Sequence, residues 1–110
     1  MLKKQNRINK EWEYKKLFDK GKYSKSKFFI IRYILLSRPD SRFGIIVGKK
    51  VSTSAVDRNR IKRRVRHIIN KNLINIPKSV DMIVLPNLQV LDAKFSDIES
   101  DFMSVIKKII

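Results

Sequence analysis

Cysteine is absent from this chain of 110 residues, and the chain contains a single histidine. Without thiols the protein has neither disulfides nor thiolate metal sites, which agrees with a cytoplasmic location. Long hydrophobic runs are absent as well. Arg32 and Arg38 interrupt the apolar stretch around residues 34–36, whereas a membrane span needs about 20 consecutive apolar residues. The basic start at residues 1–5 has no apolar stretch after it, so we expect no secretory signal.

Negative charge is scarce. Ten Asp and Glu accompany 26 Lys and Arg, which gives a formal net charge of +16 at pH 7. Such an excess repels itself unless a polyanion neutralises it, and the candidate polyanions are nucleic acid and an anionic membrane surface. Because the sequence has no membrane segment, we predict nucleic acid as the partner, with neither a membrane nor a small-molecule substrate.

The sequence also lacks the groupings of residues that an active site needs. Its carboxylates are scattered, without the pairing that holds two Mg²⁺ ions. A glycine-rich phosphate loop and a nucleophile motif are both missing. His67 has no partner group near it in the sequence, and proton transfer needs one. We therefore predict no catalytic residue, no metal bound by the protein alone, and a surface position or a phosphate contact for His67.

Internal repeats, low-complexity segments and linkers are missing too, so the sequence predicts a single domain over residues 1–110. Clusters of β-branched and aromatic residues predict three strands: residues 28–36, 43–47 and 80–85. Apolar periodicity and terminal residues predict three helices: residues 9–20 with Asn9 as N-cap and Gly21 past the end, about 20 residues from the capping box at 54–57, and a closing helix from the capping box at 96–99.

The order of these elements is helix, strand, strand, helix, strand, helix. It indicates an α+β fold, a two-layer α/β sandwich with helices covering one face of a small sheet. The turn at residues 39–41 predicts that the first two strands pair as an antiparallel hairpin. The third strand is almost wholly apolar, so we expect it at the centre of the sheet, with Pro86 at its end. Pro77 is expected to stop the second helix.

The second predicted helix is rich in cations. Six of the nine residues 58–66 are Lys or Arg, and residues 49–66 hold one acid. Arg58, Lys62 and Arg66 are spaced by four, so they form one row beside the apolar stripe of the helix. Such a row suits a phosphate backbone, because guanidinium groups grip phosphate oxygens bidentately.

A solvated helix face is the ordinary explanation for a run of cations. Like charges at this spacing, however, destabilise an isolated helix, and no carboxylates are interleaved here to relieve the repulsion. Selection for solubility favours mixed signs. We therefore favour a surface that binds RNA or DNA.

The residues of this helix and of the loop before it resemble a known family. Lys-Lys-Val at residues 49–51 and Ser-Ala-Val-Asp-Arg-Asn-Arg-Ile-Lys-Arg-Arg-Val-Arg at residues 54–66 are similar to the Arg-Asn-Arg signature of the bacterial ribonuclease P protein-subunit family. The resemblance continues over most of the chain, through residues 6–8, 14–21, 42–47 and 81–86. It implies an RNA-binding α+β sandwich with a left-handed βαβ crossover. Periodicity alone does not indicate that hand, because crossovers are normally right-handed.

The resemblance also implies roles for particular residues. The chain would be the accessory subunit of an endoribonuclease that removes the 5′ leader of precursor tRNA, with Mg²⁺ held and catalysis performed mainly by the RNA subunit. Contact with the catalytic RNA is implied for Lys49, Lys50, Arg58, Asn59, Arg60, Lys62, Arg63 and Arg66. A cleft between sheet and helices that holds the single-stranded leader is implied for Tyr14, Phe18 and Phe29. Aromatic rings at such positions are equally suited to a hydrophobic core.

Other classes of protein stay open at this point. A ribosomal protein of the same fold lineage would have the same size, charge and fold class, and only the signature helix argues against it. A DNA-binding helix-turn-helix needs a second helix packed before the recognition helix. Strands precede the basic helix here, so that class is disfavoured, as is a self-sufficient nuclease.

Overall fold

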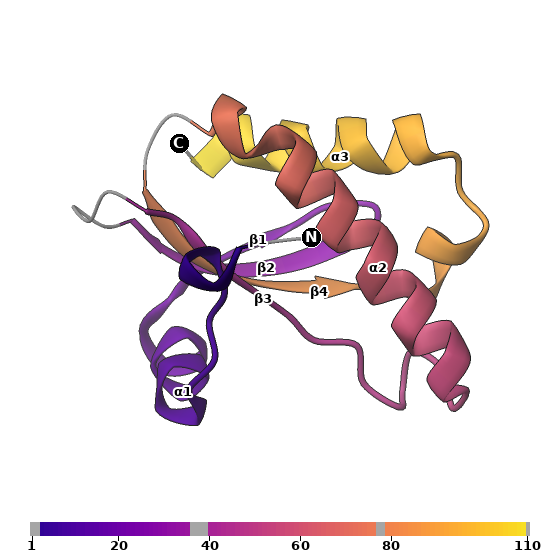
Figure 1. Ribbon diagram of the computed structural model, residues 1–110, viewed down its shortest axis with the longest axis horizontal. Coiled ribbons are helices and arrows are strands. Elements are labelled where there is room, and N and C mark those ends of the chain that lie inside the picture. Colours follow the sequence, from indigo (N-terminus) through magenta and orange to yellow (C-terminus); the bar gives the residue numbers. More distant parts are fainter. Residues whose placement is uncertain (1–2, 36–39, 77–78, 110) are drawn as a thin grey trace.

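The computed structural model describes residues 3–35, 40–76 and 79–109, and Figure 1 shows its ribbon. In chain order its elements are η1 (Lys4–Asn6), α1 (Glu11–Lys20), β1 (Lys22–Lys25), β2 (Phe29–Leu35), β3 (Arg42–Ile45), α2 (Ala55–Asn72), η2 (Leu73–Asn75), β4 (Val80–Pro86), η3 (Leu88–Leu91) and α3 (Phe95–Ile109). Helices packed on one sheet confirm the predicted α+β class. Over these ranges no helix combines the length and the apolar character that crossing a membrane requires.

Four strands form the sheet in the described part of the chain, in the order β1-β2-β4-β3. β2 pairs with β4 in antiparallel fashion, with Phe29 opposite Pro86, and β3 runs parallel to β4. The predicted hairpin of β2 with β3 is therefore wrong, because β4 lies between them. β4 is central, as predicted, since its residues are buried almost throughout. Pro39, in the predicted turn, and Pro77, the predicted stop of the second helix, lie outside the described residues.

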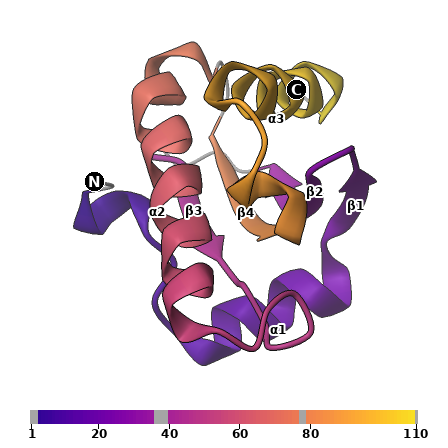
Figure 2. The same ribbon diagram turned by 90° about the vertical axis from the view of Figure 1, so that its right-hand side faces the viewer.

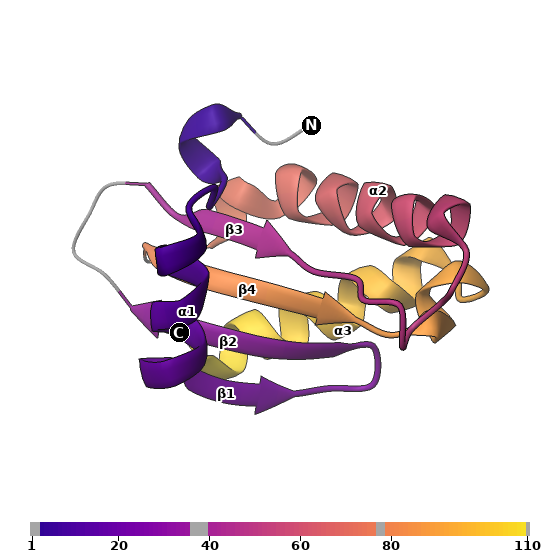
Figure 3. The ribbon, with the colours of Figure 1, turned by 90° about the horizontal axis from the view of Figure 1, so that it is seen from below.

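The connection from β3 through α2 to β4 is a left-handed crossover. In Figure 3, α2 lies behind the sheet, β3 and β4 both run to the right, and β4 lies below β3. If the molecule is turned so that α2 faces the viewer and both strands point upward, β4 lies to the left of β3. This is the reverse of the usual hand, and it is the hand that the family resemblance implied.

The helices divide between the two faces of the sheet (Figure 2). Side chains alternate along β4, so that Val80, Met82 and Val84 belong to the main core with residues of α2 and α3. Ile83 points the other way and forms a second cluster with Leu17 of α1. The expectation that helices cover one face is therefore incomplete, because α1 crosses the opposite face near the ends of the strands (Figure 3).

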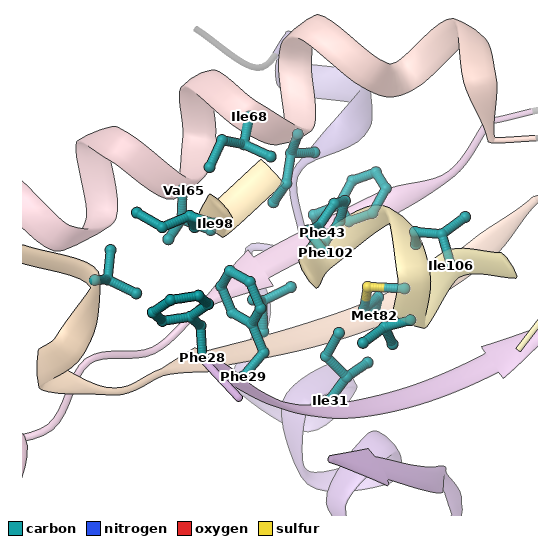
Figure 4. Close-up of a cluster of buried hydrophobic side chains, with 14 of the residues drawn as sticks. Phe28, Phe29, Ile31, Phe43, Val65, Ile68, Met82, Ile98, Phe102 and Ile106 are labelled. Atoms are coloured by element: carbon teal, nitrogen blue, oxygen red, sulfur yellow. The ribbon is translucent and has the colours of Figure 1, made fainter. Parts of the chain in front are cut away.

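The main core joins β2, β4, α2 and α3 (Figure 4). Phe29 of β2 is 2% exposed and packs edge-on against Phe102 of α3, with the ring centroids 5.7 Å apart. Val65 and Ile68 of α2 are fully buried, and both belong to the apolar stripe that the sequence predicted. The cationic helix is thus fixed to the sheet by its apolar side, which leaves its other sides for function.

Helix starts are only partly as predicted. Ser54 caps α2, since its Oγ accepts a hydrogen bond from a first-turn amide at 3.2 Å. The other two predicted caps are wrong, because α1 begins at Glu11 rather than beside Asn9, and α3 begins at Phe95, which places Ser96 inside its first turn. Packing of an apolar face, more than capping, stabilises such helices.

β1 has no counterpart among the predicted strands. Its sequence, Lys-Tyr-Ser-Lys, is polar and largely exposed, so it lacks the apolar signal of a buried strand. It becomes a strand through backbone pairing with β2 at the edge of the sheet. Lysines on an edge strand discourage pairing with another chain.

Replacing Phe29 with Ala should remove a buried ring and leave a cavity beside Phe102. We expect the free energy of unfolding to fall by about 3–5 kcal/mol, as measured by urea denaturation followed by circular dichroism. Ile30→Ala, one residue along β2 and 37% exposed, is the matched control and should cost much less. Equal stability of the two variants would contradict the placement of Phe29 in the core.

Candidate nucleic-acid interface

One flank of α2 faces η3 and the start of α3. His67 lies on this flank, exposed at the surface as predicted, with its ring centroid 5.2 Å from that of Phe95. Arg60, two turns earlier, continues the flank and is exposed. Between them, the Arg64 guanidinium donates hydrogen bonds to three carbonyl oxygens, those of Val90, Leu91 and Ala93. Arg64 is therefore a structural cation that holds the η3 segment against α2.

The opposite flank of α2 carries the row of Arg58, Lys62 and Arg66. All three residues are half-buried, as is usual for long cationic side chains whose aliphatic stems pack on the protein. Arg58 also donates from Nη1 to the carbonyl oxygen of Ser52 at 2.9 Å. This bond fixes the loop before α2, so Arg58 combines a structural contact with its place in the row.

The remaining residues of the signature are exposed. Asn59 and Arg63 lie on the outer surface of α2, between its two flanks, and Lys49 and Lys50 lie in the turn that precedes the helix. Within the described residues, no carboxylate forms an ion pair with these cations or with the row. Cations that the fold leaves unneutralised are suited to a phosphate backbone, which would exchange its counterions for them.

Tyr14 of α1 rests on the sheet at Gly44 of β3. Its hydroxyl donates to the carbonyl oxygen of Ile8 at 3.1 Å, and a Cβ atom at Gly44 would lie 2.6 Å from the tyrosine ring. Burial raises the pKa of the Tyr14 hydroxyl, the Glu13 carboxylate raises it further, and the Arg66 charge lowers it. The phenol thus stays protonated, and Arg66 lies within electrostatic reach of α1.

The three aromatic residues assigned to a leader cleft do not lie together. Tyr14 is half-buried and Phe18 is 39% exposed, and both belong to α1. Phe29 is buried in the main core, on the opposite face of the sheet, so its predicted place in the cleft is wrong. The physical reason is the alternation of strand side chains between the two faces of a sheet.

Other strand residues share the α1 face of the sheet. Ile30 of β2 is 37% exposed and Tyr23 of β1 is 53% exposed. Arg32 lies opposite Tyr23 in the β1–β2 register, with its guanidinium carbon 5.3 Å from the tyrosine ring centroid. The sequence reasoning missed all three. Side chains alternate along a strand, so placing Phe29 on the core face assigns Ile30 and Arg32 to the opposite face. Tyr23 gave no such signal, because its strand was not predicted.

Carboxylates gather on α3 rather than on α2. Glu99 accepts hydrogen bonds from the Asn72 amide at 2.8 Å and from Lys71 at 3.3 Å. The bond from Asn72 is the main cause of the lowered pKa of Glu99, to which Lys71 also contributes. Residues 79–110 hold five acids and three lysines, so the positive charge of the protein belongs to the elements before β4.

Together these features define a class of protein. It is a basic α+β protein whose second helix offers unpaired cations and whose sheet carries exposed aromatic and aliphatic groups beside α1. A surface of this kind suits nucleic acid, because cations bind a phosphate backbone and exposed rings stack on unpaired bases.

Comparisons with known proteins give the family. The model of the family described as Ribonuclease P matches residues 2–110. The ribonuclease P protein component of Syntrophomonas wolfei is 34% identical over 108 residues, which cover 98% of this chain and 90% of that protein. The component of Streptococcus thermophilus is 33% identical over 106 residues, which cover 96% of this chain and 94% of that protein.

The solved RNase P protein from Thermotoga maritima superposes with a TM-score of 0.82 at 26% identity, covering 93% of this chain and 96% of that one. The Staphylococcus aureus RNase P protein gives a TM-score of 0.80 at 28% identity, covering 96% of each chain.

The chain belongs to the ribonuclease P protein family. It is accordingly an accessory subunit of the endoribonuclease that processes the 5′ end of tRNA, and the RNA subunit of that enzyme is its partner. The alternative of a ribosomal protein is not favoured.

Two neighbouring arginines of α2 should respond differently to truncation. Arg64→Ala leaves three carbonyl oxygens without their donor, so we expect a loss of about 1–3 kcal/mol in the free energy of unfolding. Arg63→Ala removes an exposed cation, so it should leave stability unchanged within about 0.5 kcal/mol and weaken binding to the RNA subunit. Thermal unfolding and RNA affinity, measured on both variants, check the assignment. Lost stability in Arg63→Ala together with lost RNA affinity in Arg64→Ala would contradict this assignment.

Proposed function

We propose that the protein holds the catalytic RNA with α2 and the loop before it, and holds the 5′ leader of precursor tRNA on the sheet face beside α1. The observation that carries this proposal is the row of Arg58, Lys62 and Arg66. Within the described residues it has no carboxylate partners, and its last member lies within electrostatic reach of Tyr14 on α1.

The leader suits the sheet face because its bases are unpaired. Phe18, Tyr23 and Ile30 offer partly exposed apolar surface, and Arg32 adds a cation beside the ring of Tyr23. Stacking on such groups tolerates every base, since every base has a π face. A surface of this kind accepts leaders of many sequences, which an enzyme that matures many tRNAs requires.

In the proposed reaction the holoenzyme hydrolyses one phosphodiester bond, leaving a 5′-phosphate on the mature tRNA and releasing the leader. Mg²⁺ is held mainly by the RNA, which performs the chemistry, while the protein screens charge where RNA meets RNA. The described residues bring together no group of three or more His, Cys, Asp or Glu side chains that could hold a metal ion, and the assignment of Mg²⁺ to the RNA stays a prediction. We also propose a cytoplasmic location, on the argument from the sequence.

The role of α2 is tested by cleavage of precursor tRNA by a bacterial ribonuclease P RNA at low Mg²⁺. We expect the wild-type protein to restore cleavage and Lys62→Ala/Arg66→Ala to fail. The double variant should also reduce the slope of log affinity against log salt by about 2. Lys107→Ala/Lys108→Ala removes the same charge from exposed positions on α3, so it is the matched control and should restore cleavage fully.

Two results would contradict this proposal. Equal impairment by both double variants would mean that total charge, rather than its place on α2, matters. Cleavage by the purified protein without any RNA, abolished by EDTA, would place the chemistry on the protein.

The leader site is tested by the affinity of the holoenzyme for precursor tRNA and for leaderless tRNA. Phe18→Ala should weaken binding of the precursor about 5-fold or more, which corresponds to one lost stacking contact. It should leave leaderless tRNA unaffected. Phe18→Tyr keeps an aromatic ring and should restore most of the affinity. An equal loss for both RNAs would place Phe18 outside the leader site.

A further inference from the structure

α1 carries another exposed aromatic residue, on a side of the helix that does not face the proposed leader surface. Trp12 is 62% exposed, against 53% for Tyr23 and 39% for Phe18. At 3.6 residues per turn, Trp12 points well away from Tyr14 and Phe18. Because α1 crosses the sheet near the strand ends (Figure 3), these two sides of the helix border different parts of the sheet.

A pocket of about 400 Å³ lies on the Trp12 side of α1. Its lining comes from α1 and the loop before it and from β2, β3 and β4, and it includes Lys10, Trp12, Lys16, Leu17, Ile34 and Arg42. Leu17 and Ile34 also belong to the apolar cluster between α1 and the sheet. The pocket therefore combines an apolar part with an exposed indole and two lysines.

The polar wall of this pocket is formed by an ion triad of one partly exposed arginine and two buried carboxylates. Arg42 of β3 donates to Asp81 of β4 through Nε at 3.1 Å and through Nη2 at 2.8 Å. The same Nη2 forms an ion pair with Glu13 of α1. The carboxylates of Glu13 and Asp81 bring acceptor oxygens to this wall, which suit the donor groups of a base edge. Lys10 and Lys16 supply the positive charge that a phosphate needs.

Trp12 also borders a depression on the leader side of α1. This second, shallower depression of about 560 Å³ runs over the exposed surface of the helix and is lined by Glu11, Trp12, Tyr14, Lys15 and Phe18. Trp12 is the residue that the two depressions share. An extended strand that leaves Phe18 can therefore cross α1 and reach the pocket without a break in contact.

We propose that this pocket binds one further nucleotide of the leader, beyond those on the sheet face. Its base stacks on the indole of Trp12 with its edge toward the Arg42 wall, and its phosphate lies near Lys10 and Lys16. The inference rests on the proposed leader-binding function and extends it by a second base site. A leader that leaves Phe18 must cross α1 to reach the pocket, and a helix is about 10–12 Å across. Short leaders therefore end before the pocket, and only longer ones fill it.

Trp12 is the only tryptophan of the chain, so its fluorescence reports on this site alone. The experiment titrates holoenzyme with precursor tRNAs whose leaders grow one nucleotide at a time. We expect tryptophan fluorescence to stay constant for short leaders and to be quenched beyond a threshold length. Trp12→Ala should weaken binding about 5-fold or more above that length and leave shorter leaders unaffected. Trp12→Phe should recover part of the loss.

Two further variants separate the possible outcomes. Ile74→Ala, at a residue that is 91% exposed and far from α1 in the chain, is the control for loss of an exposed apolar group and should have no effect at any length. Phe18→Ala should weaken binding of short and long leaders alike. Suppose that Phe18→Ala weakens precursor binding, while Trp12 fluorescence stays constant and Trp12→Ala binds every leader normally. The second base site is then overturned and the leader surface stands. If neither variant acts on any leader, the proposed leader binding itself is overturned.

Discussion

The guanidinium of Arg42 holds together the part of the molecule on which the leader surface and the Trp12 pocket both depend. It joins three elements that are distant in the sequence, α1 through Glu13, β3 through its own backbone and β4 through Asp81. Favourable contacts with both carboxylates raise the pKa of Arg42, the bond to Asp81 being the largest cause. Glu13 and Asp81 are buried and Arg42 is partly exposed, so removing Arg42 would take from two buried carboxylates the guanidinium that they contact, which destabilises this region. The triad, together with the apolar cluster of Leu17 and Ile83, holds α1 on the sheet, and α1 in turn places Phe18 on one side and Trp12 on the other.

Local patterns predicted the parts of the fold that local forces determine. The start of α2 at Ser54, its apolar stripe and the central position of β4 all follow from spacing and composition, and the structure confirms them. The pairing of β2 with β3 was predicted from their closeness in sequence and is wrong, because the more apolar β4 takes the place between them. β1 was missed since its strand conformation comes from backbone pairing at an edge, which leaves little trace in side-chain pattern.

The candidate site shows the same division between local and tertiary information. The row on α2 followed from four-residue spacing, yet nothing in the run of cations distinguished Arg64 from Arg63. The difference lies in carbonyl oxygens some 26 residues further along the chain, which only the folded molecule brings to Arg64. Phe29 failed as a cleft residue for a simpler reason, because the alternation of β2 was available in the sequence and assigns Phe29 and Ile30 to opposite faces.

The gathering of carboxylates on α3 has a consequence for how the protein meets its partner. Cations on α2 and acids on α3 give the molecule an electrical polarity, with the α3 side close to neutral. In the field of an RNA such a body turns during diffusion, so most encounters begin with α2 foremost, and the association rate falls as salt screens the field. Once seated, it leaves the α3 side outward, with little attraction for a second nucleic acid. A protein with the same net charge spread evenly would lack this preferred orientation and would present cations to a second nucleic acid as well.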